Sequence, residues 1–167
     1  DFCLKGFYMK IMFASDIHGD FERAKKVFEI YGRENAEKLI LLGDLLYFGP
    51  RNTLTERYDP QGVIKLLNEN KEKLLCVRGN CDAEVDQMVL SFPILADYAF
   101  IERDGLRFFA THGHVINKDF CPQLRKGDIL LHGHTHVPVA EKFGDEFNIL
   151  VRFERYEKMA QSDKIDA

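Results

Sequence analysis

Five short apolar runs of this chain each end in a cluster of glycine and polar residues, and this pattern constrains the fold more than any other feature. The runs lead into the segments SDIHGD, GDLL, RGNCD, THGH and HGHTH. Short apolar runs bounded by turn residues are typical of buried β-strands. In α/β sheets, ligands bind beyond the carboxyl ends of the strands. The sequence therefore predicts a sheet-based domain with one site where five strand ends meet.

The order of the predicted elements in the first half indicates a layered α/β fold. Strands are predicted at residues 10–15, 38–44 and 74–80, with one helix after Asp20 and another that begins near Pro60. Both helices have apolar residues at helical spacing, and proline is favoured in a first helical turn. A β-α-β-α-β order is typical of a largely parallel sheet.

The second half of the chain favours antiparallel pairing. The Asp104-Gly105 turn between two apolar segments predicts a hairpin, and a second hairpin is expected to turn at Gly144-Asp145. Another strand is predicted between them, in the segment GDILLHGHTH. Parallel units followed by hairpins predict two mixed sheets packed as a sandwich, with helices on the outside.

Length and charge narrow the possible functions. A chain of 167 residues fits one domain, 1–167, and its formal net charge is −4. Binding to nucleic acid or to an anionic membrane favours a basic face, which this balance does not indicate. No apolar run approaches the ~20 residues of a membrane-spanning helix. The four cysteines lack paired zinc spacing, which favours a reduced, cytoplasmic setting. They are Cys3, Cys76, Cys81 and Cys121.

The polar clusters offer a mixed set of nitrogen and oxygen donors. Such a set suits Mn²⁺, Fe²⁺, Co²⁺ or Zn²⁺. Nine donors are too many for one ion, but they suffice for two ions that share a carboxylate, as in enzymes of phosphoryl transfer. Each cluster taken alone is also compatible with ordinary turn chemistry. The donors are Asp16, His18, Asp44, Asn80, His112, His114, His132, His134 and His136.

The ordered set D-x-H, G-D, G-N, H and G-H-x-H resembles the calcineurin-like metallophosphoesterase superfamily, and within it the YfcE-like phosphodiesterases. The segments that resemble it are MFASDIHGD, LLGDLLYFGPRN, VRGNCDAEVDQM, ATHGH and HGHTHVPVAE, between residues 9 and 147. The resemblance implies a β-sandwich flanked by helices, in a four-layer α/β/β/α arrangement. It also implies hydrolysis of small phosphodiesters by a hydroxide that bridges two metal ions.

The resemblance further implies which side chains bind the two ions. One ion would be bound by Asp16, His18 and His136, the second by Asn80, His112 and His134, and Asp44 would bridge them. Residues two apart in an extended segment share a face, so His134 and His136 are expected to point the same way. His132 has the same parity, but no ligand place remains for it. Mn²⁺ is the expected metal, with Zn²⁺, Fe²⁺, Co²⁺ and Ni²⁺ as alternatives.

Other side chains are candidates for roles beside the metals. Many superfamily members have a histidine after the Asn, as a general acid, where this chain and the YfcE-like branch have Cys81. Cys81 is therefore a catalytic candidate, and His114, expected beside the metal ligands, is the other. Arg78 and Arg51 are candidates for binding the substrate phosphate. The alternatives are a small packing residue at Cys81 and ion-paired or solvated arginines. A thiol is a less versatile acid than imidazole, so good leaving groups and modest activity are expected.

Two other functions and the assembly state stay open at this stage. Some superfamily relatives are interaction scaffolds with degraded metal sites, although all seven expected ligands are present here. A phosphomonoesterase or nucleotide phosphatase is also compatible with the fold. A nuclease is less favoured, because the chain lacks a basic and aromatic strip. Relatives often form dimers or tetramers, so a homodimer or homotetramer is expected by resemblance.

Both ends of the chain are expected to be atypical. Met9 directly precedes the first predicted strand, so residues 1–8 are expected to be a non-native extension. Relatives usually continue after the last hairpin with N-P-G-S, which can be encoded, with a following valine, as AAU-CCU-GGU-UCG-GUU. Two bases inserted after AAU change the translation to N-I-L-V-R, which stands here from Asn148. We therefore hypothesise a frameshift that makes residues 149–167 an atypical tail with incomplete C-terminal strands. A gene without N-P-G-S codons in another frame nearby would rule it out.

Overall fold

The computed structural model describes residues 10–50, 53–120, 124–137, 139–143 and 147–151. The elements are β1 (Lys10–Ala14), α1 (Phe21–Arg33), β2 (Ala36–Leu41), α2 (Pro60–Glu69), the 3-10 helix η1 (Lys71–Lys73), β3 (Leu74–Cys76), α3 (Glu84–Gln87), β4 (Tyr98–Arg103), β5 (Leu106–Thr111), β6 (Ile129–His132), β7 (Val139–Phe143) and β8 (Phe147–Val151). Among these residues, no helix has the length and apolar character needed to cross a membrane.

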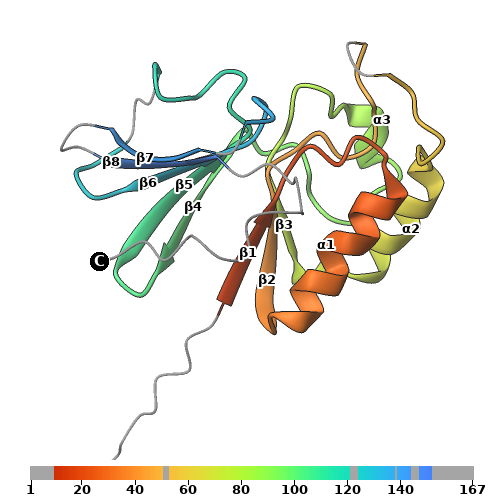
Figure 1. Cartoon of the computed structure of the whole chain (residues 1–167), viewed down its shortest axis with the longest axis horizontal. Coiled ribbons are helices and arrows are strands. Elements are labelled where there is room, and N and C mark those ends of the chain that lie inside the picture. Colours follow the sequence, from red (N-terminus) through yellow and green to blue (C-terminus); the bar gives the residue numbers. More distant parts are fainter. Residues whose placement is uncertain (1–9, 51–52, 121–123, 138, 144–146, 152–167) are drawn as a thin grey trace, which may run out of the picture.

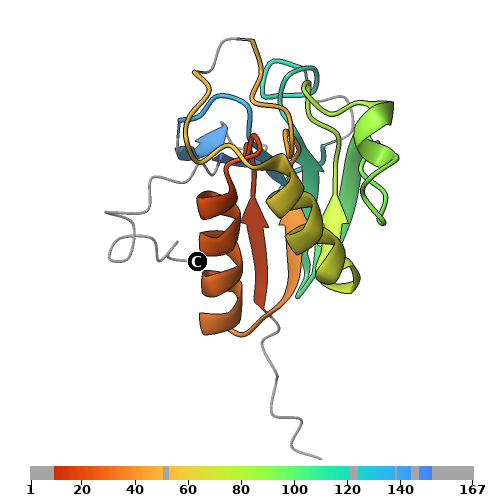
Figure 2. The same ribbon diagram turned by 90° about the vertical axis from the view of Figure 1, so that its right-hand side faces the viewer.

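The strands form two sheets that face each other, and this arrangement confirms the predicted sandwich (Figure 1). The first sheet has the order β1-β2-β3, and both of its pairings are parallel. The sequence analysis predicted a mixed sheet here, and this part of the prediction is wrong. The sheet is parallel because each of its described connections runs through a helix. Helices α1 and α2 cover its outer face (Figure 2). The resemblance implied a fourth layer, made of helices, over the outer face of the second sheet. None of the described helices lies there.

The alternation of side chains along β2 explains how the first sheet binds both of its neighbours. Leu39 and Leu41 belong to the apolar cluster shared with α1 and α2, whereas Ile40 belongs to the cluster that also contains Ala110 and Leu131 of the second sheet. Successive side chains of a strand point to opposite faces. All five residues are almost fully buried, so β2 lies in the middle of the layered core.

The second sheet has the order β4-β5-β6-β8-β7 and is mixed. The predicted first hairpin is confirmed as β4 and β5, and its turn residues Asp104 and Gly105 both have positive φ. Such a turn matches the twist of paired strands. The second hairpin is confirmed as the antiparallel pair β7 and β8, while its turn, 144–146, lies outside the described residues.

The segment predicted to begin a frameshifted tail enters this sheet. Residues 149–151 belong to β8, which pairs in parallel with β6 and antiparallel with β7. The first three residues of the predicted atypical tail therefore pair with both neighbouring strands of this sheet. Residues 1–8 and 152–167 lie outside the described residues, so the non-native extension and the frameshift stay predictions.

Helix α1 begins where the first polar cluster ends. The carboxylate of Asp20 accepts a hydrogen bond from the backbone N–H of Arg23 at 3.0 Å, which caps the helix. An aspartate at this position binds N–H groups that have no partner inside the helix. Asp59 caps α2 in the same way, with Pro60 as its first residue, as predicted. Both helices therefore start beside the end of the sheet where the polar clusters gather.

Candidate metal centre

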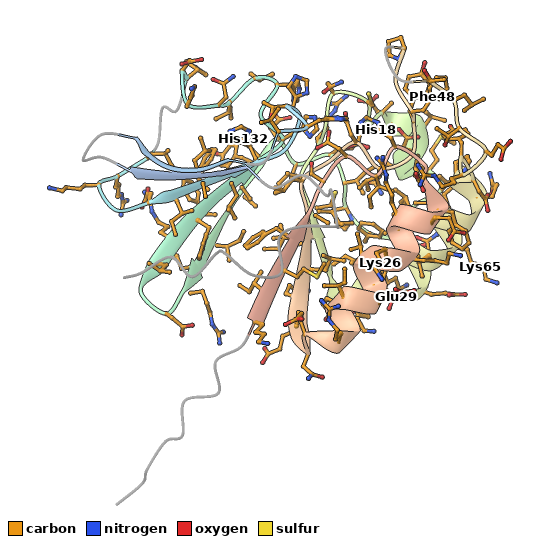
Figure 3. The ribbon with its side chains drawn as sticks, in the orientation of Figure 1. His18, Lys26, Glu29, Phe48, Lys65 and His132 are labelled. Atoms are coloured by element: carbon orange, nitrogen blue, oxygen red, sulfur yellow. The ribbon has the colours of Figure 1, made fainter. Side chains whose placement is uncertain are left out.

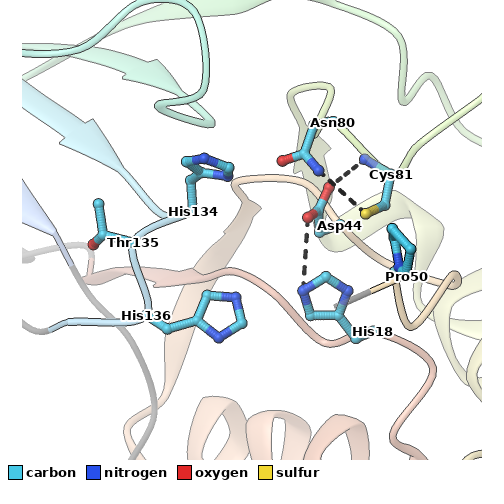
Figure 4. Close-up of a pocket in the computed structure, with 9 residues that line it drawn as sticks. His18, Asp44, Pro50, Asn80, Cys81, His134, Thr135 and His136 are labelled. Atoms are coloured by element: carbon cyan, nitrogen blue, oxygen red, sulfur yellow. Dashed lines mark hydrogen bonds and ion pairs between the residues drawn. The ribbon is translucent and has the colours of Figure 1, made fainter. Parts of the chain in front are cut away.

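The polar clusters lie in loops at the carboxyl ends of β1, β2, β3, β5 and β6, which meet at one end of the sandwich (Figure 3). The predicted convergence of five strand ends is therefore confirmed. A cleft of about 280 Å³ opens among these loops. Figure 4 shows the side chains from both sheets that face it. It is lined by His18, Asp44, Gly49, Pro50, Asn80, Cys81, His134, Thr135 and His136.

The backbone of these loops is bent in an uncommon way. Seven described residues other than glycine have positive φ, and five of them belong to the predicted ligand set. Positive φ is costly for residues with a side chain and clusters at functional sites. The surrounding structure must therefore enforce these conformations. The five are Asp16, His18, Asp44, His134 and His136.

Asp16, His18 and His136 form the first group of potential ligand atoms. Their ligand atoms all lie within 4.8 Å of one another. Asp16 Oδ1 is 3.2 Å from His136 Nε2 and 3.6 Å from His18 Nε2. Asp16 Oδ1 and His18 Nε2 are buried, and within the described part of the chain neither has a hydrogen-bond partner. Unpaired buried polar atoms are costly, so their convergence favours a bound cation between them.

Asp44 lies between His18 and His112, which belong to different strand-end loops. Its Oδ2 is 3.6 Å from His18 Nε2 and 3.4 Å from His112 Nε2. Its Oδ1 accepts a hydrogen bond from the backbone N–H of Cys81 at 2.7 Å. One carboxylate oxygen therefore stays directed at both imidazoles, which is the placement that a bridging ligand needs.

His112 is fully buried, and its hydrogen bonds fix its orientation. Its Nδ1 is 2.6 Å from the carbonyl oxygen of Leu42, so that nitrogen must be the donor. Its Nε2 faces two acceptors, Asn80 Oδ1 at 3.0 Å and Asp44 Oδ2 at 3.4 Å. These contacts require either a proton or a cation at Nε2. His18 is oriented similarly, because its Nδ1 donates to Tyr47 O at 2.8 Å. Such backbone partners commonly orient metal-binding histidines.

The electrostatics of the site favour charged carboxylates. Burial by itself would raise the pKa of Asp16, but the neighbouring His18 and Ser15 side chains outweigh it and lower that pKa to about 2. Burial would lower the pKa values of His18 and His112, but Asp16 beside the former and Asp44 beside the latter raise both. Negative potential is thus concentrated where the unpaired atoms meet, which attracts cations.

His134 and His136 enter the cleft for a reason other than the predicted one. Strand β6 ends at His132, and both later histidines have positive φ in the loop that follows. The expectation of an extended segment with two-residue parity is therefore wrong. The backbone N–H of His134 donates to Asp16 Oδ2 at 3.0 Å, and the His134 ring lies 5.1 Å from the His112 ring. His132 itself is buried, and Gly133 O is 3.1 Å from its Nδ1.

The other candidates differ in how close they lie to the cleft. Cys81 lines it, and burial together with Asp44 raises the pKa of its thiol to about 12. This shift keeps the thiol protonated. The His114 ring lies 5.3 Å from the His112 ring, although His114 is not among the lining residues. The Arg78 Nε donates to Asp82 O, and Arg78 does not line the cleft either. Arg51 lies outside the described residues.

Asp82 organises two of the ligand loops, and sequence reasoning assigned it no role. Its buried carboxylate accepts three backbone hydrogen bonds, from Asp44 at 2.8 Å, Leu45 at 2.9 Å and Gly79 at 2.7 Å. It thereby ties the loop after β2 to the loop after β3. The aspartate of RGNCD was visible in the sequence, but its partners lie up to 38 positions away.

Gly79 is required by the same close approach of the two loops. A Cβ at this position would lie 2.1 Å from Asp44 Oδ1 and 2.4 Å from the Asp44 backbone nitrogen. We expect Gly79→Ala to reduce the free energy of unfolding by about 1–3 kcal/mol, because one loop must shift. Urea unfolding measures this change. Gly32→Ala is the control, since its Cβ would meet nothing within 4 Å. Equal stability of the two variants would contradict the close contact.

Comparisons with known proteins agree with this geometry. Residues 9–151 match the calcineurin-like phosphoesterase superfamily domain. Phosphodiesterase YfcE of Escherichia coli strain K12 is 48% identical over 140 residues, which cover 84% of this chain and 76% of that protein. A phosphodiesterase of Methanocaldococcus jannaschii is 29% identical over 146 residues, covering 82% and 79%. The solved structure of the phosphoesterase YfcE from E. coli matches with a TM-score of 0.82 and 46% identity, covering 86% of this chain and 78% of that one.

Proposed function

This chain belongs to the calcineurin-like phosphoesterase superfamily and is a metal-dependent phosphodiesterase, and we propose that it hydrolyses small phosphodiesters with two divalent cations in the cleft. The observation that supports this proposal most strongly is the pair of buried atoms without a hydrogen-bond partner, Asp16 Oδ1 and His18 Nε2. His112 adds to it, because its Nε2 faces two acceptors. Cations would satisfy both groups at once.

The ligands divide into two sets around one shared carboxylate. One cation is bound by Asp16, His18 and His136, whose ligand atoms form one compact group. The other is bound by Asn80, His112 and His134. Asp44 bridges the sets, and its Oδ2 lies within 3.6 Å of imidazoles from both. Carboxylate, amide oxygen and imidazole suit Mn²⁺, which we propose as the resident metal, with Zn²⁺, Fe²⁺, Co²⁺ or Ni²⁺ as alternatives.

The side chains of the cleft prepare the site for an anionic substrate. Divalent cations there would lower the pKa of water toward ~7 and offset the charge of the phosphoryl group. Cys81 lines the cleft and is our candidate for protonating the departing oxygen. The raised pKa of its thiol makes it a weak acid, in line with the modest activity expected. His114 is a positioning candidate beside His112. Arg51 stays a candidate for binding phosphate, whereas Arg78 is engaged by Asp82 O and Glu84.

Hydrolysis rates for matched esters test the reaction class. We expect a bis-aryl phosphodiester to be hydrolysed faster than the corresponding aryl monoester when Mn²⁺ is present. The reason is that a monoester adds negative charge, whereas the described residues that line the cleft include no arginine or lysine to balance it. Release of nitrophenol from both esters measures the difference. Faster monoester hydrolysis would favour a phosphomonoesterase or nucleotide phosphatase, and no metal-dependent turnover of either ester would favour an interaction scaffold.

Metal binding should depend on pH, because cations compete with protons for the histidines. Asp16 and Asp44 raise the pKa values of His18 and His112, so both rings retain protons to a higher pH than usual. Those protons must leave before a cation binds. We expect the apparent Mn²⁺ affinity to rise between about pH 6 and about pH 8, with protons released at neutral pH. Calorimetry in buffers of different ionisation enthalpy measures the release. A constant affinity without proton release would contradict these ligand roles.

Two broader properties follow as proposals. Cys76 and Cys81 are free thiols, which favours a reducing, cytoplasmic environment. A homodimer or homotetramer is proposed by resemblance alone. Light scattering measures the mass in solution, and a monomer at micromolar concentration would contradict it.

A further inference from the structure

A second cleft adjoins the proposed metal centre. It has a volume of about 210 Å³ and shares His18 and His136 with the first cleft. The two clefts therefore adjoin at these two side chains. The remaining walls come from the loop after β1, from the start of α1 and from the connection between β2 and α2.

One wall of this cleft is fastened to the loop that contains His18. The backbone N–H of Asp59 donates to Gly19 O at 2.9 Å, and the N–H of Phe21 donates to Arg57 O at 3.1 Å. Together with the bridge between Asp20 and Tyr58, these bonds hold residues 57–59 against the first ligand loop. The cleft is therefore formed before any substrate arrives, which lowers the entropic cost of binding.

The charges at the cleft favour an anion. The buried carboxylate of Asp20 has its Oδ2 3.3 Å from the Nε atoms of both Arg23 and Arg57. Among the described residues that line the cleft, two are arginines and one is an aspartate, so cationic side chains outnumber anionic ones. The arginine side chains are 41% and 53% exposed, so they remain accessible from the cleft. Guanidinium groups bind carboxylates and phosphates through their planar arrangement of donors.

Aromatic rings form another part of the same cleft. Phe48 and Tyr58 both line it, and their ring centroids are 5.4 Å apart at 79°. Tyr47 also contacts Phe48, with ring centroids 4.9 Å apart. Figure 3 shows Phe48 at the same end of the molecule as His18. Such ring arrangements accept a further flat group by edge or stacking contacts.

We propose that the second cleft binds one ester group of the substrate, and that this group is aromatic and bears an anionic substituent. The inference rests on the proposed phosphodiesterase function, because it places the phosphate at the metal centre. Phe48 and Tyr58 contact the ring, while Arg57 and Arg23 bind the anionic substituent. Substrate preference is then set by residues that take no part in the chemical step.

Competitive inhibition by three monoesters tests the proposal. Methyl phosphate, phenyl phosphate and 4-carboxyphenyl phosphate share one phosphate group and differ only in what reaches the second cleft. Each is measured against hydrolysis of bis(4-nitrophenyl) phosphate by the Mn²⁺-loaded protein. We expect the inhibition constant to fall in that order, with about fivefold tighter binding of carboxyphenyl than of phenyl phosphate, as for a partly exposed ion pair.

Variants assign this discrimination to named side chains. Arg57→Met should lower the ratio of phenyl to carboxyphenyl inhibition constants, and the Arg23→Met/Arg57→Met double variant should bring it from about five to about one. Arg57→Lys should retain more of the ratio than Arg57→Met, through its charge. Phe48→Leu should reduce the advantage of phenyl over methyl. Arg33→Met is the matched control, because Arg33 lies in the last turn of α1, and it should keep the wild-type ratios.

The outcomes separate this proposal from the function on which it rests. If the diester is hydrolysed and all three monoesters inhibit equally, the proposal for the second cleft is wrong, while the phosphodiesterase function stands. A preference that survives in the Arg23→Met/Arg57→Met double variant also overturns it, since the anionic group would then bind elsewhere. Absence of metal-dependent hydrolysis of the diester overturns the phosphodiesterase function and the subsite together.

Discussion

Asp44→Asn should reduce kcat/KM for a phosphodiester by more than about 100-fold. The carboxylate lies between His18 and His112 and is the proposed bridge, so its loss should exceed the roughly 10–100-fold effect of removing a group that only orients a ligand. The substitution preserves shape and removes only the charge. The number of Mn²⁺ ions bound per chain should fall from about two to one or fewer.

Asp104→Asn provides the matched control for this substitution. Asp104 is a 59% exposed turn residue between β4 and β5, so the same chemical change should leave activity and metal content unaltered. Steady-state kinetics and metal analysis on the same samples give both quantities. An Asp44→Asn protein that retains two ions and wild-type turnover would show that this carboxylate is not the bridge.

Asp82→Asn should weaken both folding and metal binding, although Asp82 contributes no proposed ligand. The carboxylate now accepts hydrogen bonds from three backbone N–H groups, and the new amide nitrogen must face at least one of them. That buried donor then loses its partner. We expect a loss of about 2–4 kcal/mol in the free energy of unfolding. Because the loops of Asp44 and Asn80 are no longer tied together, Mn²⁺ affinity should fall by about 10–100-fold.

Asp86→Asn separates this positioning role from the general effect of an aspartate substitution. Asp86 accepts one backbone hydrogen bond, from Ala83 at 2.8 Å, at the start of α3. Its replacement should cost about 1 kcal/mol or less and leave Mn²⁺ affinity unchanged. Denaturant unfolding and calorimetric titration are measured for both variants. If the two variants have equal Mn²⁺ affinity, Asp82 does not position the ligand loops.

The convergence of ligand-type side chains could be predicted because it follows from strand direction alone. Parallel strands end at the same edge of a sheet, so polar residues after β1, β2 and β3 must lie near one another. The helix starts at Asp20 and Pro60 could be predicted equally well, since capping chemistry is local. Neither inference required knowledge of distant contacts.

The conformation of the loop after β6, which contains His134 and His136, could not be predicted in the same way. His134 and His136 have positive φ, which short-range sequence patterns do not favour for histidine. The loop is enforced by contacts such as the hydrogen bond from His134 N–H to Asp16, which joins residues 118 positions apart. The three backbone bonds of Asp82 likewise depend on how separate loops approach each other. The second cleft arises from the pairing of residues 57–59 with the first ligand loop, which no local motif encodes.

Titration of the metal-free protein with Mn²⁺ tests the central claim most directly. Bound Mn²⁺ per chain and the rate of aryl phosphodiester hydrolysis are recorded on the same samples. If two cations act together in the cleft, the rate should rise with occupancy and reach its maximum only near two ions per chain. Full hydrolysis in the presence of a chelator, or at zero bound Mn²⁺, would contradict a metal-dependent mechanism at this site.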